Sequence, residues 1–235
     1  MASAMVMQHD TGKVHAWRHA QPLGVEGLLG GAGRLCIGHT DVRVDPRRIR
    51  RLARRIARIA QRDGLPKIIR TSPLQRCADV GRWLKRLGWV HQIDERLIEM
   101  HFGAWEGRAW SALPRAGLDA WAADFCGYAP GGGESVAALV RRAAAWDNGC
   151  DALGDKGRNV PAAAVVVTHA GWMRARRWAE SVMAGVNRRI DERGTQANPQ
   201  AALEQALARL SAEGFPASPS YGERWNLNGK KLGNP

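Results

Sequence analysis

Apolar and polar residues follow two patterns along the chain, short apolar runs and longer amphipathic segments. The short runs predict β-strands at residues 14–17, 67–71, 89–93 and 165–168. The amphipathic segments predict α-helices at residues 46–63, 72–87, 135–147 and 172–183. Because strands and helices alternate, we expect an α/β fold, a three-layer α/β/α sandwich around a mostly parallel central sheet.

The C-terminal part of the chain adds two further elements to this pattern. Residues 199–212 have helical spacing and predict a helix, and residues 221–227 predict an edge strand. A length of 235 residues suits one substantial core. We therefore expect a single domain at residues 13–228, with a flexible N-terminus at 1–12 and a flexible C-terminus at 229–235.

Two of the predicted helices have recognisable starts. Asp45 followed by Pro46 is typical of an N-cap and a first helical residue. Ser72 followed by Pro73 predicts the start of the next helix. The inner face of that second helix is expected to hold Leu74, Cys77, Ala78, Leu84 and Leu87.

The formal net charge of +13 is concentrated in the first predicted helix. Eight of its residues are arginines, at positions 47, 48, 50, 51, 54, 55, 58 and 62. Apolar residues recur at helical spacing beneath them, so a solvated outer face explains the charge. The helix has no aromatic residue that could stack on a base, and we do not expect a nucleic-acid partner.

The cysteines and the start of the chain bear on the cellular setting. Cys36, Cys77, Cys126 and Cys150 lie far apart without a C-x-x-C spacing, which favours reduced thiols and gives no metal-site pattern. The first residues have neither a basic leader nor a sustained apolar stretch. We expect a cytoplasmic protein with no membrane association.

Two histidines come directly after predicted strands. Arg18 and His19 follow the strand at 14–17, and His169 follows the strongest apolar run, residues 162–167. The carboxyl ends of parallel strands meet at one edge of a sheet, where ligands bind. The sequence therefore predicts a cationic pocket built around an imidazole.

Six short blocks occur in an order that is specific in combination. They read RHAQP at 18–22, GHTD at 38–41, SPLQR at 72–76, LIEMHFGAWEG at 97–107, GGES at 132–135 and THAG at 168–171. In these blocks the chain resembles the histidine phosphatases, also called the phosphoglycerate mutase-like superfamily. The resemblance extends from about residue 14 to residue 183.

This resemblance implies a two-step phosphoryl transfer. His19 is expected to attack phosphorus and form a phosphohistidine that water then hydrolyses, while Arg18, Arg76 and His169 bind the phosphate. The chemistry of the residues agrees, because phosphoryl transfer needs positioning and charge stabilisation, which arginine and histidine provide. The arginines should also disfavour protonation of His19. No metal and no other cofactor is expected.

The reaction also needs a proton donor for the leaving oxygen. In one branch of the family the donor is the glutamate of the L-x-E block, here Glu99, whereas another branch uses an aspartate directly after the second histidine. That position is Ala170 in this chain, so Glu99 is the expected general acid and His19, Glu99 and His169 the expected catalytic set. Glu106 is the nearby competitor.

The chain departs from the family pattern after the first histidine. Ala20 stands where glycine is usual, and Pro22 stands where threonine or serine is common. The asparagine that often follows in the first loop has no clear match among residues 23–30. Substrate choice is expected to depend on residues 23–37 and 113–130.

The stretches at 99–107 and 132–135 most resemble the α-ribazole phosphatases of cobalamin biosynthesis. The resemblance implies removal of the 5′-phosphate of a nucleotide-like substrate. The alternatives are a phosphoglycerate mutase, a broad-specificity phosphatase, and a binding protein that holds nucleic acid or an acidic partner on the arginine-rich helix. The expected partner is a small phosphorylated substrate, and a homodimer is left open.

Overall fold

The computed structural model describes residues 14–24, 34–146, 165–193, 198–213, 218 and 220–227. The predicted flexible termini, 1–12 and 229–235, lie outside these residues, as do residues 162–164 of the apolar run and Cys150. Every predicted strand and helix has a counterpart in the described part of the chain. In the same part, no helix is long and apolar enough to span a membrane.

The centre of the molecule is a five-stranded sheet in the order β3-β2-β4-β1-β5. Its strands are β1 (His15–Arg18), β2 (Ile68–Thr71), β3 (Val90–Ile93), β4 (Val165–Thr168) and β5 (Arg224–Asn226). The first four strands are parallel to one another, and β5 pairs antiparallel with β1 at the edge. The expected mostly parallel sheet, including its C-terminal edge strand, is confirmed.

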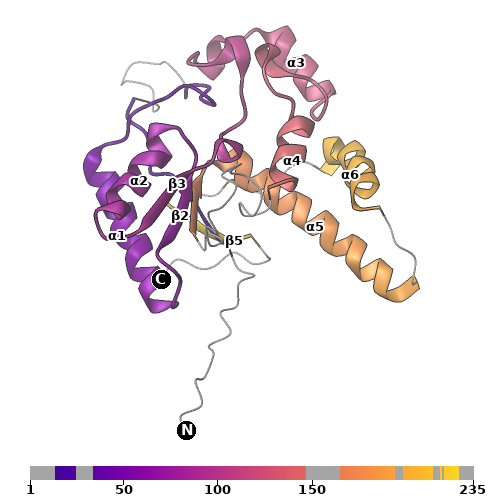
Figure 1. The fold of residues 1–235 in the computed structure, drawn as a ribbon. Helices are drawn as coiled ribbons and strands as arrows, with labels where there is room; N and C mark the ends of the chain where they lie inside the picture. The colour runs from indigo at the N-terminus through magenta and orange to yellow at the C-terminus, as the bar shows by residue number, and fades with distance from the viewer. Residues whose placement is uncertain are drawn as a thin grey trace, which may run out of the picture.

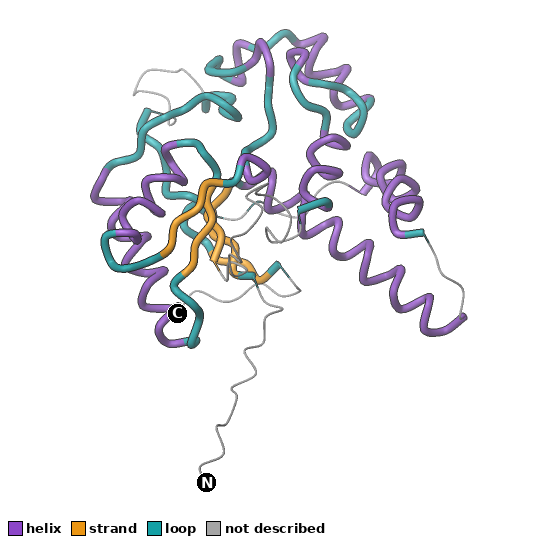
Figure 2. The backbone as a smooth tube through the Cα atoms, in the orientation of Figure 1, coloured by secondary structure: helices purple, strands orange, loops and turns teal. Residues whose placement is uncertain are grey.

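Helices cover both faces of the sheet, as Figures 1 and 2 show. On one face lie α1 (Pro46–Arg62) and α2 (Gln75–Lys85), whose apolar residues form one cluster with Trp17, Ile69 and Val167 of the strands. On the other face lie α4 (Val136–Ala144), α5 (Ala170–Arg193) and α6 (Pro199–Glu213), which pack with Ala16 and Val166. Neighbouring strand residues alternate between the two clusters, since successive side chains point to opposite faces.

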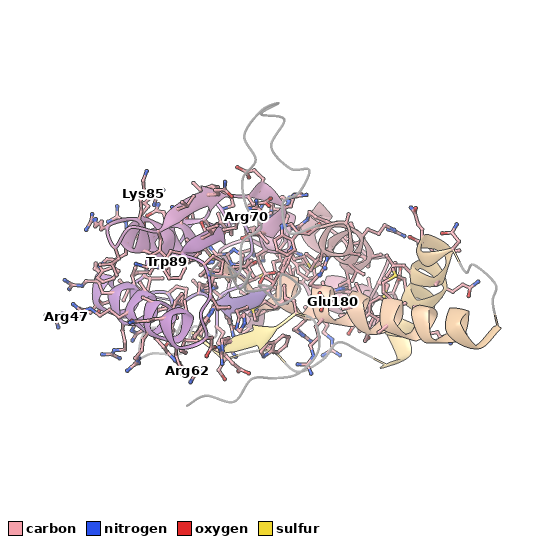
Figure 3. The ribbon with its side chains drawn as sticks, turned by 60° about the horizontal axis from the view of Figure 1, so that its bottom comes forward. Arg47, Arg62, Arg70, Lys85, Trp89 and Glu180 are labelled. Atoms are coloured by element: carbon pink, nitrogen blue, oxygen red, sulfur yellow. The ribbon has the colours of Figure 1, made fainter. Side chains whose placement is uncertain are left out.

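The outer side of α1 carries the arginines, as predicted. Its buried residues are Ile49, Leu52, Ala53, Ile56, Ile59 and Ala60, while the arginines project outward. Asp45 caps the helix by accepting a hydrogen bond from the backbone N–H of Arg47 at 2.7 Å. Figure 3 shows the Arg47 and Arg62 side chains at the periphery, on the side of the molecule that also carries Lys85.

The bounds of α2 and α5 differ from the prediction. α2 begins at Gln75 because residue 74 still has an extended backbone, and it ends at Lys85. Leu87 therefore lies beyond the helix and is 45% exposed, so its predicted inner position is wrong. α5 continues ten residues past Met183, since the residues after it include no proline.

A helical segment rises above the carboxyl edge of the sheet. It contains α3 (Arg115–Ala123) and short 3-10 turns at Glu95–Leu97, Gly103–Trp105, Trp110–Ala112 and Pro130–Gly132. The sequence did not predict α3, a short helix with no side-chain cap that packs on a small separate cluster around Trp105. This segment lies above the sheet (Figure 1) and covers the site described next.

Candidate active site

The predicted histidines meet at the carboxyl edge of two adjacent strands. Arg18 and Thr168 are register partners at the ends of β1 and β4, and His19 and His169 follow them. The backbone N–H of His19 donates to the carbonyl of Thr168 at 3.0 Å, which ties the two chain segments together. The imidazole rings lie with centroids 5.1 Å apart.

The guanidinium of Arg76 is held rigidly beside these rings. Arg76 is the second residue of α2 and is only 1% exposed. It donates to the carbonyl oxygens of Gly38 and Thr40 and, through Nε, to Nδ1 of His169 at 3.2 Å. Three hydrogen bonds from one planar group fix its orientation.

Arg18 is placed by a different contact. Its guanidinium carbon lies 3.9 Å from the ring centroid of Tyr221, a cation–π arrangement that also orients the cation. Tyr221 contacts the His19 ring as well, with centroids 5.6 Å apart. Tyr221 comes from the segment just before β5, so the C-terminal edge strand helps to build the site.

The protonation state of His19 follows from its surroundings. Nδ1 lies 2.8 Å from the carbonyl oxygen of Ala20, and because a carbonyl only accepts, Nδ1 carries the proton. Burial lowers the pKa of His19 well below its usual value, and the charges of Arg76 and Arg18 lower it further. The ring is therefore neutral near pH 7, with the lone pair on Nε2.

His169 lies behind His19 and is fully buried. Its Nδ1 accepts from Arg76, so its Nε2 carries the proton and donates to the hydroxyl of Ser72 at 2.8 Å. Burial, followed by the charge of Arg76, lowers its pKa well below the usual value. Both ring nitrogens thus have protein partners, and direct contact with a phosphate requires the exchange of one of these bonds.

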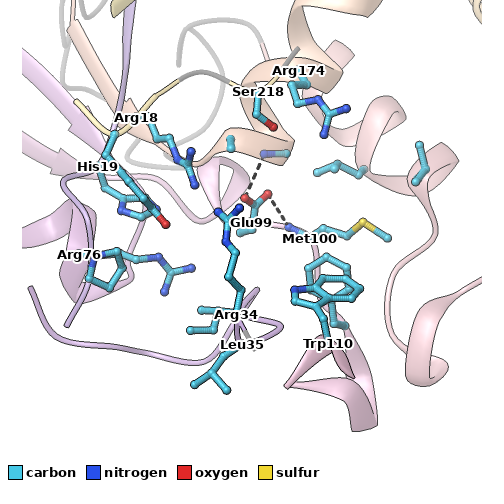
Figure 4. Close-up of a pocket in the computed structure, with 18 of the residues that line it drawn as sticks. Arg18, His19, Arg34, Leu35, Arg76, Glu99, Met100, Trp110, Arg174 and Ser218 are labelled. Carbon is cyan, nitrogen blue, oxygen red and sulfur yellow. Dashed lines mark hydrogen bonds between the residues drawn. The ribbon is translucent and has the colours of Figure 1, made fainter. Parts of the chain in front are cut away.

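Glu99 stands at the N-terminus of α5, where backbone N–H groups have no partner inside the helix. Its carboxylate accepts from the backbone N–H of Gly171 at 3.0 Å, of Trp172 at 3.2 Å and of Met100 at 3.0 Å. Figure 4 shows this carboxylate in the middle of the pocket, between Arg34 and Arg174. The predicted general acid is therefore firmly positioned at the cavity.

Glu106, the competing carboxylate, has another arrangement. It accepts from the backbone N–H groups of Gly38, His39, Thr40 and Phe102 and from the hydroxyl of Thr40. Although burial acts in the opposite direction, these hydrogen bonds lower its pKa to about 2. A carboxylate that remains ionised and binds five donors has a structural role, as the anchor of the GHTD loop.

The other histidines in the described residues are not among those that line the cavity. His39 supports Glu99 indirectly, since its Nε2 lies 2.9 Å from the Glu99 carbonyl oxygen, and its ring packs on His101. His91 contacts the Thr71 hydroxyl, and burial lowers its pKa to about 4. These contacts give the three histidines structural or supporting roles.

The pocket itself is a cavity of about 660 Å³ between the sheet edge and the helical segment above it. One end holds Arg18, His19, Arg76 and Glu99. The other wall is aromatic and consists of Phe102, Trp110, Trp121 and Phe125, with Trp110 stacked on Trp121 at a centroid distance of 6.2 Å. The two predicted substrate segments both contribute, since Arg34 and Leu35 come from the first and Trp121 and Phe125 from the second.

The polar pocket residues that sequence reasoning missed include Arg34, Arg174 and Tyr221. Arg174 is five residues beyond His169, so its spacing from the THAG block could have signalled a position on the inner side of the helix start. Arg34 and Tyr221 had no such signal, because each reaches the cavity from a segment without regular periodicity.

The chain also matches known proteins. A family model described as the histidine phosphatase superfamily (branch 1) matches residues 14–182. Among solved structures, a mycobacterial protein named hydrolase 1 is 21% identical with a TM-score of 0.59, over 90% of this chain and 86% of that chain. A mycobacterial glucosyl-3-phosphoglycerate phosphatase is also 21% identical, with a TM-score of 0.57 over 90% and 88%.

No curated protein matches the sequence significantly. At 21% identity the two mycobacterial structures show a shared fold, whereas the family model spans most of the chain. Four of the six sequence blocks, those at 18–22, 72–76, 97–107 and 168–171, contribute residues to one cavity. The protein therefore belongs to the histidine phosphatase superfamily, branch 1, which confirms the predicted fold and the predicted enzyme class, a phosphatase.

Proposed function

We propose that the protein is a metal-independent phosphomonoesterase that works through a phosphohistidine on His19. The observation that carries this proposal is the fixed tautomer of His19, whose Nδ1 donates to the Ala20 carbonyl and leaves the Nε2 lone pair for attack. A neutral imidazole is the nucleophilic form, and its depressed pKa keeps it so at physiological pH.

In the first step, Nε2 of His19 forms a bond to phosphorus while the bond from phosphorus to the leaving oxygen breaks. Arg18 and Arg76 stabilise the charge on the equatorial oxygens, the largest contribution that a protein makes to this chemistry. Glu99 gives its proton to the leaving oxygen. The products of this step are the free alcohol and a phosphohistidine.

In the second step, water attacks the phosphohistidine and the bond from phosphorus to Nε2 breaks. The Glu99 carboxylate takes a proton from that water, which restores the protonated acid for the next cycle. His169 supports both steps from behind, since it accepts from Arg76 and fixes that guanidinium. We assign His169 this positioning role together with the predicted phosphate contact.

At the level of substrate, α-ribazole 5′-phosphate is the first candidate, as the sequence blocks imply. The aromatic wall of Phe102, Trp110, Trp121 and Phe125 supports it, because a flat heteroaromatic base packs well on such rings. A second candidate is a phosphomonoester with an additional acidic group, such as a phosphoglycerate. The arginines beyond the phosphate site support that candidate.

Hydrolysis of para-nitrophenyl phosphate and of an alkyl phosphate by wild type, His19→Ala and Glu99→Gln tests this proposal. We expect His19→Ala to lose turnover of both substrates while remaining folded. We expect Glu99→Gln to lose much more activity on the alkyl phosphate, because nitrophenolate leaves without protonation. Full turnover by His19→Ala would refute the proposal, and inactive wild type that binds nucleic acid in a salt-dependent way would favour the binding-protein alternative.

A further inference from the structure

The ring of Tyr221 contacts two groups on which the proposed mechanism depends. The guanidinium carbon of Arg18 lies 3.9 Å from the centroid of this ring, and the centroid of the His19 imidazole lies 5.6 Å from it. The His19 imidazole also packs on His169, with centroids 5.1 Å apart. The nucleophile is therefore covered by two rings, and one of them also holds the cation of Arg18.

A tight turn places the Tyr221 ring. The backbone N–H of Glu223 donates to the carbonyl of Ser220 at 2.9 Å, which closes a β-turn with Tyr221 and Gly222 at its centre. Gly222 has a φ of 71°, the left-handed conformation that such a turn requires at its third residue. The Glu223 carboxylate accepts from the backbone N–H of Ser220 at 2.6 Å and from the indole N–H of Trp225 at 2.9 Å, so the turn is also tied to β5.

The turn is bonded directly to the backbone of the site. The N–H of Gly222 donates to the carbonyl oxygens of Arg18 at 3.0 Å and His19 at 3.3 Å, and the N–H of Arg18 donates to the carbonyl of Glu223 at 3.1 Å. On its other side, Arg18 pairs with β4. Because these bonds hold the two backbones together, the Tyr221 ring and the Arg18 guanidinium keep a fixed relation.

The turn lies outside the part of the chain that matches the family. The family model ends at residue 182, well before residues 220–223, and none of the six sequence blocks includes them. A role of Tyr221 in the reaction is therefore a property of this chain that membership of the family does not imply.

We propose that Tyr221 is a positioning residue for the phosphoryl transfer, whose ring holds the Arg18 guanidinium towards the phosphate and excludes water from the His19 imidazole. This inference rests on the proposed function and adds a residue to it. A guanidinium that lies on the face of a ring keeps N–H groups at its edge, so Arg18 can still donate to phosphate oxygens. Exclusion of water favours the neutral imidazole, which is the form that attacks phosphorus.

Three variants test this role. Tyr221→Ala removes the ring, whereas Tyr221→Phe keeps it. Tyr128→Ala is the matched control, because Tyr128 is the other of the two tyrosines in the chain and is not among the residues that line the pocket. The quantities to measure are kcat and KM for para-nitrophenyl phosphate at each pH, and the protonation of His19 by NMR, with its imidazole signals identified by their loss in His19→Ala.

We expect Tyr221→Ala to lower kcat about 10-fold or more, the size of effect that loss of a desolvated cation–π contact allows. KM should change less, because Arg18 contributes most when charge develops in the transition state. The acid-side decline of kcat/KM and the protonation of His19 should both move to higher pH, since an imidazole that is open to water is protonated more easily. Tyr221→Phe should behave like wild type, and Tyr128→Ala should leave the titration of His19 unchanged.

A double-mutant cycle with Arg18→Gln separates positioning from a general loss of structure. If Tyr221 acts through Arg18, adding Tyr221→Ala to Arg18→Gln should reduce kcat much less than it does in wild type. Tyr221→Leu, which keeps apolar bulk without a ring, replaces Tyr221→Ala if circular dichroism shows that the alanine variant is unfolded.

An unchanged kcat and an unchanged titration of His19 in Tyr221→Ala would overturn the proposal, and so would equal losses in Tyr221→Phe and Tyr221→Ala. Fully additive losses in the cycle would also overturn it. Failure of the proposed function looks different. In that case wild type does not hydrolyse the phosphate ester, yet the NMR titration still reports whether the Tyr221 ring shields His19.

Discussion

At the scale of single residues, two carboxylates seven positions apart acquire opposite roles from their hydrogen bonds. Glu106 binds four backbone N–H groups and a hydroxyl and anchors the loop at residues 38–40. Glu99 faces the cavity between two arginines. Both glutamates could be identified as candidates from the sequence. Their different roles become clear only from the position of the loop at residues 38–40, which binds Glu106.

Replacing Glu106 should therefore reduce stability rather than chemistry. In Glu106→Gln the amide group cannot accept from all five donors, and we expect the free energy of unfolding to fall by about 2–3 kcal/mol. The pKa of Glu106 is lowered from 4.5 to about 2, so its ionised form adds stability above pH 4.5 that is lost as the pH falls towards 2. Urea unfolding should accordingly give a difference between the two proteins at pH 7 that shrinks below pH 4.5. A constant difference would contradict this role.

In the proposed mechanism, the depressed pKa of His19 sets the acid limit of activity. The nucleophile must be neutral, and protonation begins only as the pH falls towards a folded-state pKa well below 6.5. We expect kcat/KM for para-nitrophenyl phosphate to stay level from pH 7 down through 6.5 and to decline at lower pH. A decline with its midpoint at or above 6.5 would show that His19 is not desolvated as described.

Several site residues could be predicted because they occur in recognisable blocks. Arg18 ends β1, His19 and His169 directly follow strands, and Arg76 lies in the first turn of α2, so the order of the elements brings them to one edge. Arg34 and Tyr221 could not be predicted, because they reach the pocket from irregular segments whose path is set by long-range packing.

At the scale of elements, the N-terminus of α5 positions Glu99, the proposed proton donor. The first N–H groups of the helix bind Glu99, and Gly171 permits this close approach. A Cβ atom on Gly171 would lie 2.4 Å from Oε1 of Glu99. Glycine is needed at position 171 of the THAG block because a side chain there would occupy the space of the Glu99 carboxylate.

Gly171→Ala should displace the Glu99 carboxylate. We expect kcat for an alkyl phosphate to fall at least 10-fold, with a smaller loss for para-nitrophenyl phosphate, while the circular dichroism spectrum is unchanged. Gly185→Ala on the same helix is the matched control, since nothing lies within 4 Å of its added Cβ. That control should keep full activity and gain slightly in stability from better helix propensity. Equal activity of both variants would contradict the role given to Gly171.

The order of the strands and helices could be predicted from the hydrophobic periodicity, but their first and last residues could not. Asp45 and Ser135 mark helix starts because their side chains accept from backbone N–H groups. The start of α2 has no such cap, so the prediction placed it three residues early. The missed helix α3 packs on aromatic residues of its own segment, and this local cluster gave no clear helical pattern.

At the scale of the whole molecule, the positive charge of the pocket comes from four separate segments. Arg18 is the last residue of β1, Arg34 lies in the loop before residue 36, Arg76 is on α2, and Arg174 is on α5. In the proposed mechanism, Arg18 and Arg76 supply the charge that a metal ion provides in other phosphatases. We therefore expect full activity after dialysis against EDTA and no gain on adding Mg²⁺, Mn²⁺ or Zn²⁺. Activity that disappears with the chelator and returns with a divalent ion would contradict the mechanism.

The central claim is that phosphate passes through His19, and a trapping experiment tests it most directly. Wild-type protein is mixed with a ³²P-labelled phosphomonoester, quenched in alkali within one turnover and digested, and the labelled peptide is sequenced. The account predicts an acid-labile, alkali-stable label on the peptide that contains His19, absent from His19→Ala and present in Arg58→Gln. A label on another residue, or rapid turnover with no labelled protein at any quench time, would contradict it.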